Sequence, residues 1–364
     1  MLRSSSWAFG LLALAASASA LLRFPCSQLV TQRFDPFNLT MHPDNDLGAL
    51  SSCTTCRFKE DKSNYWTAVL YFHHQNGSFI RVPQMANHYT GNPNGGMTIY
   101  YFQPRAPTKD LKVVAFRKGF RMIVGNPMRR RDDISPSITA HKQLTWRCFE
   151  GNSIGAGTPG VGPEDTIDLP KKFCSGGIRS NIYFPQCWDG VNLDSPDHSS
   201  HVAHPLGTPS REGLQIFGTD CPSSHPVRIP LLFIEIVWDT RPFNNANLWP
   251  KDGTQPLVMS MGDPTGFGQH ADYVFGWEGD SLQRAMDICT GGDGLPESCR
   301  ELTLQTDQEI NRCTQPVKVD EPTEGTYLNE LPACNPLQPG PAPATMIPNC
   351  NAVSTTFNPQ PTKV

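Results

Sequence analysis

Apolar residues along the chain gather in short runs that are separated by turn-forming residues. The clearest runs are rich in β-branched and aromatic residues and cover 65–72, 98–102, 111–116, 120–124 and 231–238. Such runs predict β-strands. One helix is predicted over 280–288, where apolar residues recur at helical spacing before Cys289. The pattern therefore predicts a mostly β protein with a β-sandwich-like core, long disulfide-crosslinked loops and a few short helices.

The two ends of the chain differ in composition from its middle. Residues 1–20 show a positive charge at Arg3, then an apolar stretch and small residues, which is the pattern of a secretory signal peptide. We interpret residues 21–315 as a single β-rich domain and residues 316–364 as a proline-rich C-terminal tail. No later run has the length of a transmembrane helix, so we expect a secreted, extracellular protein without a membrane partner.

Cysteine usage agrees with an oxidising compartment. The chain has 12 cysteines, an even number that predicts six disulfides. Cys53 and Cys56 form a C-x-x-C pair, but no second such pair is present to complete a zinc ribbon, which favours structural disulfides. Asn38 and Asn76 begin sequons and are predicted glycosylation sites.

Charge excludes one large class of partners. The net charge is −4, and the only basic cluster, Arg129 to Arg131, is followed by two aspartates. A nucleic-acid surface needs a broad basic face, so we expect no nucleic-acid partner and interpret the cluster as a solvated loop or a processing-like site. The serine-hydrolase elbow, the zinc-protease helix, the phosphate loop and the dinucleotide fingerprint are all absent from the sequence. The sequence leaves the oligomeric state open.

The densest polar segment runs from Cys187 to His204. It contains these candidate residues: Trp188, Asp189, Asn192, Asp194, Asp197, His198, His201 and His204. Carboxylates and imidazoles in this density supply a general acid and base or metal ligands. The alternative is that the histidines cap turns. Trp188 is interpreted either as a sugar-stacking platform or as a core aromatic packed on the Cys187 disulfide.

A second polar segment covers residues 262–273 and is rich in glycine. Its glycines let the backbone approach a ligand closely, with His270 and Asp272 on or beside the loop; the alternative is an ordinary hairpin loop. We expect His198, His201 and His270 to converge, as a catalytic centre with Asp194 and Asp197 or as ligands of a divalent metal ion. Trp188, Asp189, Asn192 and Asp272 are then the substrate-binding residues.

Five long strings carry a family resemblance. They are SCTTCRFKEDKSNYWTAVLYF, FRKGFRMIVGNP, IRSNIYFPQCWDGVNLDSPDHSSHVAHP, CPSSHPVRIPLLFIEIVW and GDPTGFGQHADYVFGWE. They resemble the secreted fungal domain-of-unknown-function family numbered nineteen ninety-six. Members are secreted and some carry wall- or sugar-binding modules, so the resemblance implies work near cell-wall polysaccharide.

The resemblance is interrupted after Pro36. Family members continue there with a short segment that bears a His-x-His motif and a Gly-Gly, whereas here Pro36 is followed directly by Phe37. An error in joining exons and a genuine loss of the segment both produce this junction. In either case the resemblance implies an incomplete polyhistidine centre.

Two functions follow from the sequence. The first is an extracellular carbohydrate-active hydrolase or lyase that acts on cell-wall or other polysaccharide through the His/Asp centre. The second is a non-catalytic secreted protein that binds the wall or another partner through the same loops. Convergence of the candidate residues in one place favours the enzyme, and their scatter over separate loops favours the binding protein.

Overall fold

Short strands make up most of the regular structure. The computed structural model describes residues 21–27, 46–85, 95–103, 112–151, 162, 164–207, 220–291, 294–314 and 325–347. The strands are β1 (Leu21–Ser27), β2 (Asn64–Thr67), β3 (Leu70–His73), β4 (Phe79–Arg81), β5 (Gly96–Phe102), β6 (Arg121–Gly125), β7 (Leu144–Cys148), β8 (Ile178–Tyr183), β9 (Cys187–Trp188), β10 (Val202–Ala203), β11 (Val227–Arg228), β12 (Leu231–Trp238), β13 (Leu257–Met259), β14 (His270–Val274) and β15 (Tyr327–Leu328). The predicted mostly β class is confirmed.

Helices in the described ranges are few and short. They are α2 (Leu47–Leu50), α3 (Ser281–Ile288) and α4 (Asp307–Arg312), with 3-10 turns η1 (Thr139–Lys142), η2 (Arg241–Phe243), η3 (Pro296–Ser298) and η4 (Pro332–Cys334). The helix predicted before Cys289 is confirmed as α3, which buries Leu282, Ala285 and Met286. Within the described residues, no helix combines the length and the apolar character that a membrane span requires.

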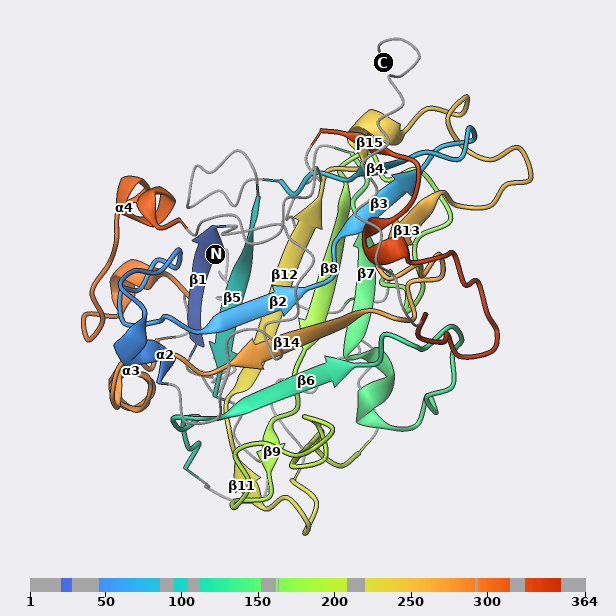
Figure 1. Ribbon diagram of the computed structural model, residues 1–364. Helices are drawn as coiled ribbons and strands as arrows, with labels where there is room; N and C mark the ends of the chain where they lie inside the picture. The colour runs from blue at the N-terminus through green and yellow to red at the C-terminus, as the bar shows by residue number, and fades with distance from the viewer. Residues whose placement is uncertain are drawn as a thin grey trace, which may run out of the picture.

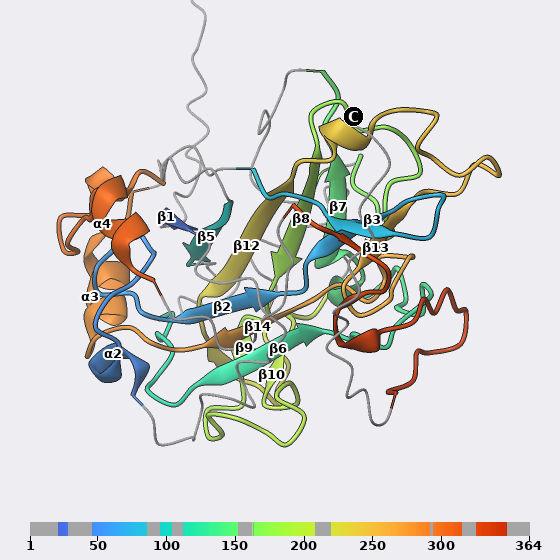
Figure 2. The same cartoon turned by 45° about the horizontal axis from the view of Figure 1, so that its top comes forward.

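Within the part of the chain that the structure describes, the strands form four antiparallel sheets. Their orders are β1-β5-β12-β8-β7, β2-β14-β6, β13-β3-β4-β15 and β10-β9-β11. The three-stranded sheet β2-β14-β6 lies across the five-stranded sheet, and the three helices lie beside β1 at one end (Figures 1 and 2). Two sheets in face-to-face layers make the sandwich that the sequence predicts.

The main core fills the space between these two layers. Alternate residues of β12, such as Ile234 and Ile236, face it together with Met122 of β6 and Ala271 of β14, and all four are fully buried. β12 is central in its sheet and is buried on both faces, which explains its continuous apolar sequence. Since the inner residues of β6 and β14 face the core, their alternate residues Arg121 and Asp272 lie on the opposite face.

A chain of hydroxyl groups joins the two layers inside the core. Tyr65 donates to Asp61 at 2.6 Å and lies 2.7 Å from the hydroxyl of Tyr101, which in turn donates to Tyr273 at 3.1 Å. Asp61 is fully buried, and burial raises its pKa to about 6. These tyrosines come from both sheets, so their hydrogen bonds fix how one layer sits on the other.

Two of the predicted strands differ from the observed ones. The run 65–72 is divided between β2 and β3, which belong to different sheets. The described residues of 111–116 form no strand, because the amide of Ala115 donates to the Gln283 side chain at 2.8 Å and the amide of Val114 donates to the Arg228 carbonyl. Val113, Ala115 and Phe116 are buried nonetheless, which accounts for the apolar run.

Disulfides connect the loops to the sheets. The pairs with both partners described are Cys26–Cys56, Cys53–Cys313, Cys148–Cys174, Cys187–Cys221 and Cys289–Cys299. Cys334 is also disulfide-bonded, to a partner outside the described residues, and no described cysteine is free. The C-x-x-C pair is therefore divided between two structural disulfides, as expected.

Part of the predicted tail belongs to the folded domain. β15 pairs with β4, and the amide of Gln338 donates to the Gly262 carbonyl at 2.9 Å. The contacts of the domain thus continue beyond residue 315, where the composition changes. Residues 1–20, the predicted signal peptide, lie outside the described residues, and β1 begins directly after them.

Candidate functional site

The polar loop between β9 and β10 is hydrogen-bonded to the free edge of β6. The amide of Arg121 donates to the Leu193 carbonyl at 3.1 Å, and the amide of Ile123 donates to the His198 carbonyl at 2.8 Å. A tight turn follows, in which the amide of His198 donates to the Ser195 carbonyl at 2.8 Å. Pro196 favours such a turn because its ring fixes φ.

The turn places an aspartate–histidine dyad at the surface. Nδ1 of His198 lies 2.6 Å from Oδ1 of Asp194, and both side chains are about one-third exposed, at 31% and 28%. Asp194 Oδ2 lies 3.4 Å from Nε of Arg121. His198 has a φ of 52°, a left-handed conformation that is uncommon for a residue with a Cβ and that concentrates at functional sites. The dyad orients the imidazole so that its neutral form accepts protons at Nε2.

His201 lies behind the dyad and is buried. Its Nε2 lies 2.9 Å from the Arg121 carbonyl and its Nδ1 lies 2.9 Å from the Ser195 hydroxyl. Burial lowers the pKa of His201, while the hydrogen bond to Arg121 and the charges of Asp194, Asp189 and Asp197 oppose that effect. His201 is therefore neutral near pH 7 and has no face open to a polymeric substrate.

Asp197 organises the loop and is not suited to be a proton donor. Its Oδ1 accepts from the amides of Ser199 and Ser200 at 3.2 and 2.9 Å, and from the Ser195 hydroxyl at 2.8 Å. These hydrogen bonds, with Ser200 first, hold the pKa of Asp197 well below its usual range. A carboxylate that stays ionised cannot act as a general acid, which corrects that part of its predicted role.

The predicted substrate-binding residues of this loop also have structural roles. Asp189 accepts from the amides of Val191 and Asn192 and from the Asn192 side chain. Burial raises the pKa of Asp189, but these hydrogen bonds outweigh it and hold the pKa below its usual value. Trp188 is only 2% exposed, and its ring contacts Phe120 and Arg117. The core interpretation of Trp188 therefore holds, and a sugar ring cannot stack on it.

His270 and Asp272 lie on β14, which is separated from the loop by β6. They face the same side of the sheet as Arg121, and both are buried, at 8% and 5% exposure. Nδ1 of His270 lies 2.8 Å from the Gly268 carbonyl. His270 is paired with Gly125, whereas His201 is bonded to Arg121; four residues of strand separate these positions by about 13 Å.

The three predicted histidine ligands are therefore not gathered at one point. Within the described residues, the only group of three potential ligand side chains with atoms within 4.8 Å of one another is Cys26, Cys56 and Asp61. Its cysteines are joined in a disulfide and offer no thiolate. The expected convergence of His198, His201 and His270 on one metal ion is wrong, because β6 holds them at different positions along its length.

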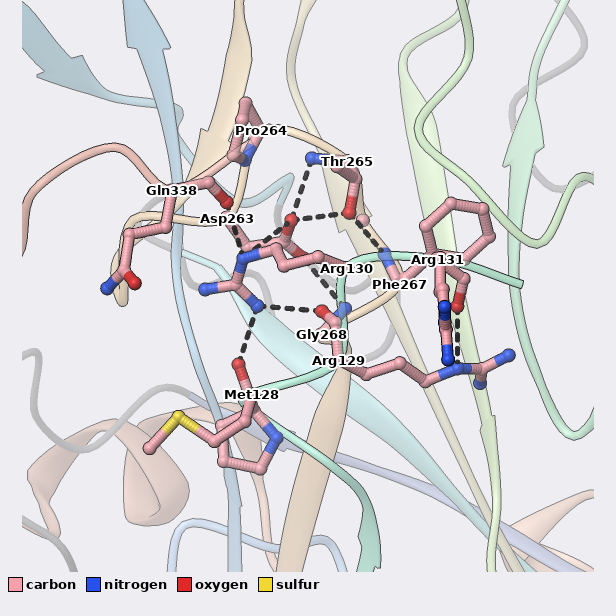
Figure 3. A network of polar contacts seen from close by, with 12 residues as sticks. Met128, Arg129, Arg130, Arg131, Asp263, Pro264, Thr265, Phe267, Gly268 and Gln338 are labelled. Atoms are coloured by element: carbon pink, nitrogen blue, oxygen red, sulfur yellow. Dashed lines mark hydrogen bonds and ion pairs between the residues drawn. The ribbon is translucent and has the colours of Figure 1, made fainter. Parts of the chain in front are cut away.

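The glycine-rich loop is organised around a buried ion pair. Asp263 is fully buried; Oδ1 accepts from the amide and hydroxyl of Thr265, and Oδ2 accepts from the amide of Gly268 at 2.7 Å (Figure 3). Nε of Arg130 lies 3.6 Å from Asp263 and donates to the Gln338 carbonyl at 2.7 Å. A Cβ on Gly268 would meet both side chains, at 2.8 and 2.9 Å, so the loop requires glycine there.

The same ion pair corrects the interpretation of the basic cluster. Arg130 is 3% exposed and donates to the carbonyls of Pro127 and Arg129, both at 2.7 Å. Arg129 lies beside it and forms ion pairs with Asp132 and Asp133. Arg130 is therefore part of the folded domain, whereas Arg131 is exposed, as expected of a solvated loop.

One predicted glycosylation site is described. Asn76 is exposed in the turn between β3 and β4, and its Oδ1 accepts from the amide and the hydroxyl of Ser78 at 3.0 and 2.7 Å. Asn76 thus lies at a surface turn, as expected of a sequon that is open to modification. Asn38 and the junction between Pro36 and Phe37 lie outside the described residues.

Sequence reasoning missed three groups. Ser195 and Arg121 contact the predicted histidines, and Trp66 places its ring 5.5 Å from that of His270. The contact with Arg121 could not be predicted, because its strand β6 is far from the histidines in the sequence. The aspartate-rich turn was the only available signal for Ser195.

A second buried polar cluster covers the outer face of the five-stranded sheet. Arg147 contacts Asp165 at 2.6 Å and Arg179 contacts Glu235 at 2.8 Å, with Asn181 hydrogen-bonded between them. Two cations face two anions, and all four side chains are at least nine-tenths buried. The cluster is charge-balanced, which is what a structural network requires.

Comparison with known proteins agrees with the residue pattern. The model of a family described as "Domain of unknown function (DUF1996)" matches residues 34–277, more than half of the 364-residue chain. The chain belongs to this family. The DUF1996 region ends at Trp277 and so contains both polar loops, β6 and β14. No curated protein and no solved structure matches the chain.

Proposed function

We propose that the protein is a secreted enzyme that acts on cell-wall or other extracellular polysaccharide, with the Asp194–His198 dyad as its acid–base group. The observation that carries the proposal is the 2.6 Å contact between these two side chains at the surface, on a turn with a left-handed histidine. A histidine oriented by a carboxylate is suited to move a proton during cleavage of a glycosidic bond or elimination across it.

Other features support the setting. The disulfides fit an extracellular compartment, and the sequence of residues 1–20 has the pattern of a secretory signal peptide. The buried guanidinium of Arg121 lies 3.4 Å from Asp194 and helps to position that carboxylate in the dyad. N-terminal sequencing of protein from the culture medium tests secretion, and an N-terminus at Leu21 is the expected result.

The catalytic part is tested with purified protein on a panel of polysaccharides, by measuring new reducing ends and unsaturated products. The variants His198→Gln and Asp194→Asn should lose about 10²-fold or more of the activity. His141→Gln is the matched control, because His141 lies 3.3 Å from Asp132 in a second histidine–aspartate pair, outside the loop that carries the dyad. Equal activity of all three variants would show that the dyad is not the acid–base group. A chelator arm reports whether a divalent metal ion takes part.

A non-catalytic, wall-binding function is favoured by a different surface. Phe173 is 42% exposed, and its ring stands edge-on against Trp249 with centroids 4.5 Å apart. Exposed aromatic rings are the groups on which sugars stack. Sedimentation with insoluble polysaccharide should then depend on Phe173, and Phe173→Ala should release the protein while His198→Gln does not.

A further inference from the structure

The loop that carries the dyad contains a second pair of groups with a different chemistry. We propose that Ser195 is the nucleophile of an esterase centre, with His201 as its general base and carboxylic esters as substrates. The inference goes beyond the proposed function, because the bond is an acyl ester and neither His198 nor Asp194 takes the proton.

The hydrogen bonds of His201 determine which nitrogen is the base. The Arg121 carbonyl only accepts hydrogen bonds, so Nε2 of His201, 2.9 Å away, carries the proton. In the neutral ring Nδ1 is then a lone pair, and it faces the Ser195 hydroxyl at 2.9 Å. A nucleophile beside its base, with the base oriented by a third group, is the arrangement of an activated serine. Here a backbone carbonyl orients the base.

His201 and Ser195 differ in burial, and the difference fits a base and a nucleophile. His201 is 1% exposed, whereas Ser195 is only partly buried on a loop of which Pro196 and Asp197 are exposed. The base thus lies beneath the surface with Nδ1 facing the hydroxyl, and the hydroxyl lies nearer to the surface. Burial also lowers the pKa of His201, which keeps the imidazole neutral and able to accept a proton near pH 7.

Asp197 is a second acceptor for the hydroxyl of Ser195. Its Oδ1 lies 2.8 Å from the Ser195 hydroxyl, on which His201 also converges. The hydroxyl has one proton, which it donates either to Asp197 or to Nδ1 of neutral His201, and attack on the ester uses the second arrangement. Negative charge on Asp194, Asp189 and Asp197 favours the imidazolium formed during the reaction.

The reaction then balances in two steps. Ser195 Oγ forms a bond to the ester carbonyl carbon, its proton passes to His201 Nδ1, and the bond from that carbon to the alcohol oxygen breaks as the alcohol takes the proton. Water next attacks the acyl-serine, gives a proton to Nδ1 and releases the carboxylic acid, while Oγ regains its proton.

A purely structural role of the loop would not require the hydroxyl of Ser195. Asp197 already receives the Ser199 and Ser200 amides, so the turn is capped without the Ser195 hydroxyl. The Ser195 amide binds Asp194 at 2.8 Å and survives any change of the side chain. Ser195→Ala is therefore expected to fold, which makes the proposal testable.

The test is labelling of the full chain with a fluorophosphonate, followed by peptide mapping, and hydrolysis of p-nitrophenyl acetate. We expect the label on Ser195, a rate of labelling that rises with pH as His201 loses its proton, and a loss of about 10³-fold in hydrolysis for Ser195→Ala. Ser199→Ala is the matched control and should label normally. Ser195→Cys should exchange fluorophosphonate labelling for reaction with iodoacetamide.

Two results would overturn the inference. One is the absence of label on Ser195 in folded protein, and the other is hydrolysis that Ser195→Ala leaves unchanged. Failure of the two functions is distinguishable, because polysaccharide cleavage is tested by His198→Gln and ester hydrolysis by Ser195→Ala. If His201→Gln fails to fold, the pH dependence of labelling of the wild-type protein decides the role of the base, and a pH-independent rate excludes it.

Discussion

The loops at 187–204 and 262–270 look alike in sequence, since each combines glycine, aspartate and histidine, yet they hold their aspartates in opposite ways. Asp263 is fully buried and faces the buried Arg130, whereas Asp197 is exposed and is held by amides and hydroxyls of its own turn. The first loop is fixed to the rest of the fold by its charge. The second is fixed by its backbone and keeps polar side chains at the surface.

This difference shows which polar loop is available for chemistry. A buried carboxylate that already has a cation and three donors has no capacity for a substrate, and its role is to hold the loop. The dyad at Asp194 and the hydroxyl of Ser195 lie on the loop that is held by its own backbone, with two amides donating to Asp197. Composition alone does not separate the two cases, but burial and the position of the counter-charge do.

The largest expected effect comes from removing the buried carboxylate. Asp263→Ala leaves Arg130 buried without its partner and leaves the amides of Thr265 and Gly268 without an acceptor, so we expect a loss of about 3–5 kcal/mol in the free energy of unfolding. The matched variant Asp197→Ala should cost at most about 1 kcal/mol, because water replaces the lost acceptor. Urea denaturation measures both, and equal losses would contradict the comparison.

The next effect tests how the surface loop is attached. The disulfide Cys187–Cys221 closes 34 residues of sequence separation at the base of the loop. Replacing both cysteines by alanine should cost about 3–4 kcal/mol, since the unfolded chain gains the entropy that the crosslink removed. Hydrogen exchange should increase at residues 187–204 and stay unchanged around Asp263. Unchanged exchange in the surface loop would mean that β6 alone holds it.

Sequence patterning predicted the layers better than their connections. β12 was predicted with both boundaries because it is buried on both faces and its run is continuous. The run 65–72 was predicted as one strand, but it is divided between β2 and β3 in different sheets. The run 111–116 has buried side chains but does not pair as a strand, since the Gln283 side chain accepts the hydrogen bond of one of its backbone amides. The alternation of apolar and polar residues predicts which side chains are buried, but it does not predict which group accepts the hydrogen bond of each backbone amide.

The candidate site was predictable in part for a similar reason. The dyad is local, because Asp194 and His198 are four residues apart within one turn. The role of Asp263 depends on Arg130, and the position of His201 depends on the Arg121 carbonyl, both far away in sequence. Trp188 had two interpretations from its sequence, and only its burial selects the core one.

A smaller effect follows from the histidine at the end of the surface loop. Burial lowers the pKa of His204 to about 4, from a usual value of 6.5. Between these values the unfolded chain binds a proton that the folded protein does not, so stability is present above about pH 6.5 and is lost as pH falls toward 4. Asp61, with its pKa raised to about 6, acts in the opposite direction over part of this range.

The variant His204→Gln isolates this contribution. The difference in unfolding free energy between wild type and variant should change by about 1–2 kcal/mol between pH 7.5 and pH 5, with the wild type losing more on acidification. Chemical denaturation at the two pH values measures it, and the contribution of Asp61 cancels because both proteins contain it. If the difference in unfolding free energy does not change with pH, His204 is exposed to water in the folded protein and its pKa is not lowered.

The smallest expected effect is at His198, where the comparison becomes sharpest. His198 has a φ of 52°, a conformation that asparagine tolerates better than other residues with a Cβ. His198→Asn should therefore change the unfolding free energy by less than about 0.5 kcal/mol, whereas His198→Val should cost about 1–2 kcal/mol, because a β-branched side chain is strained there. Both variants remove the imidazole, so any loss of activity that they share is chemical, and the extra loss of stability in the valine variant is conformational. A loss with asparagine as large as that of Asp263→Ala would mean that the dyad holds the loop together, and the surface loop would then be no better suited to chemistry than the buried one.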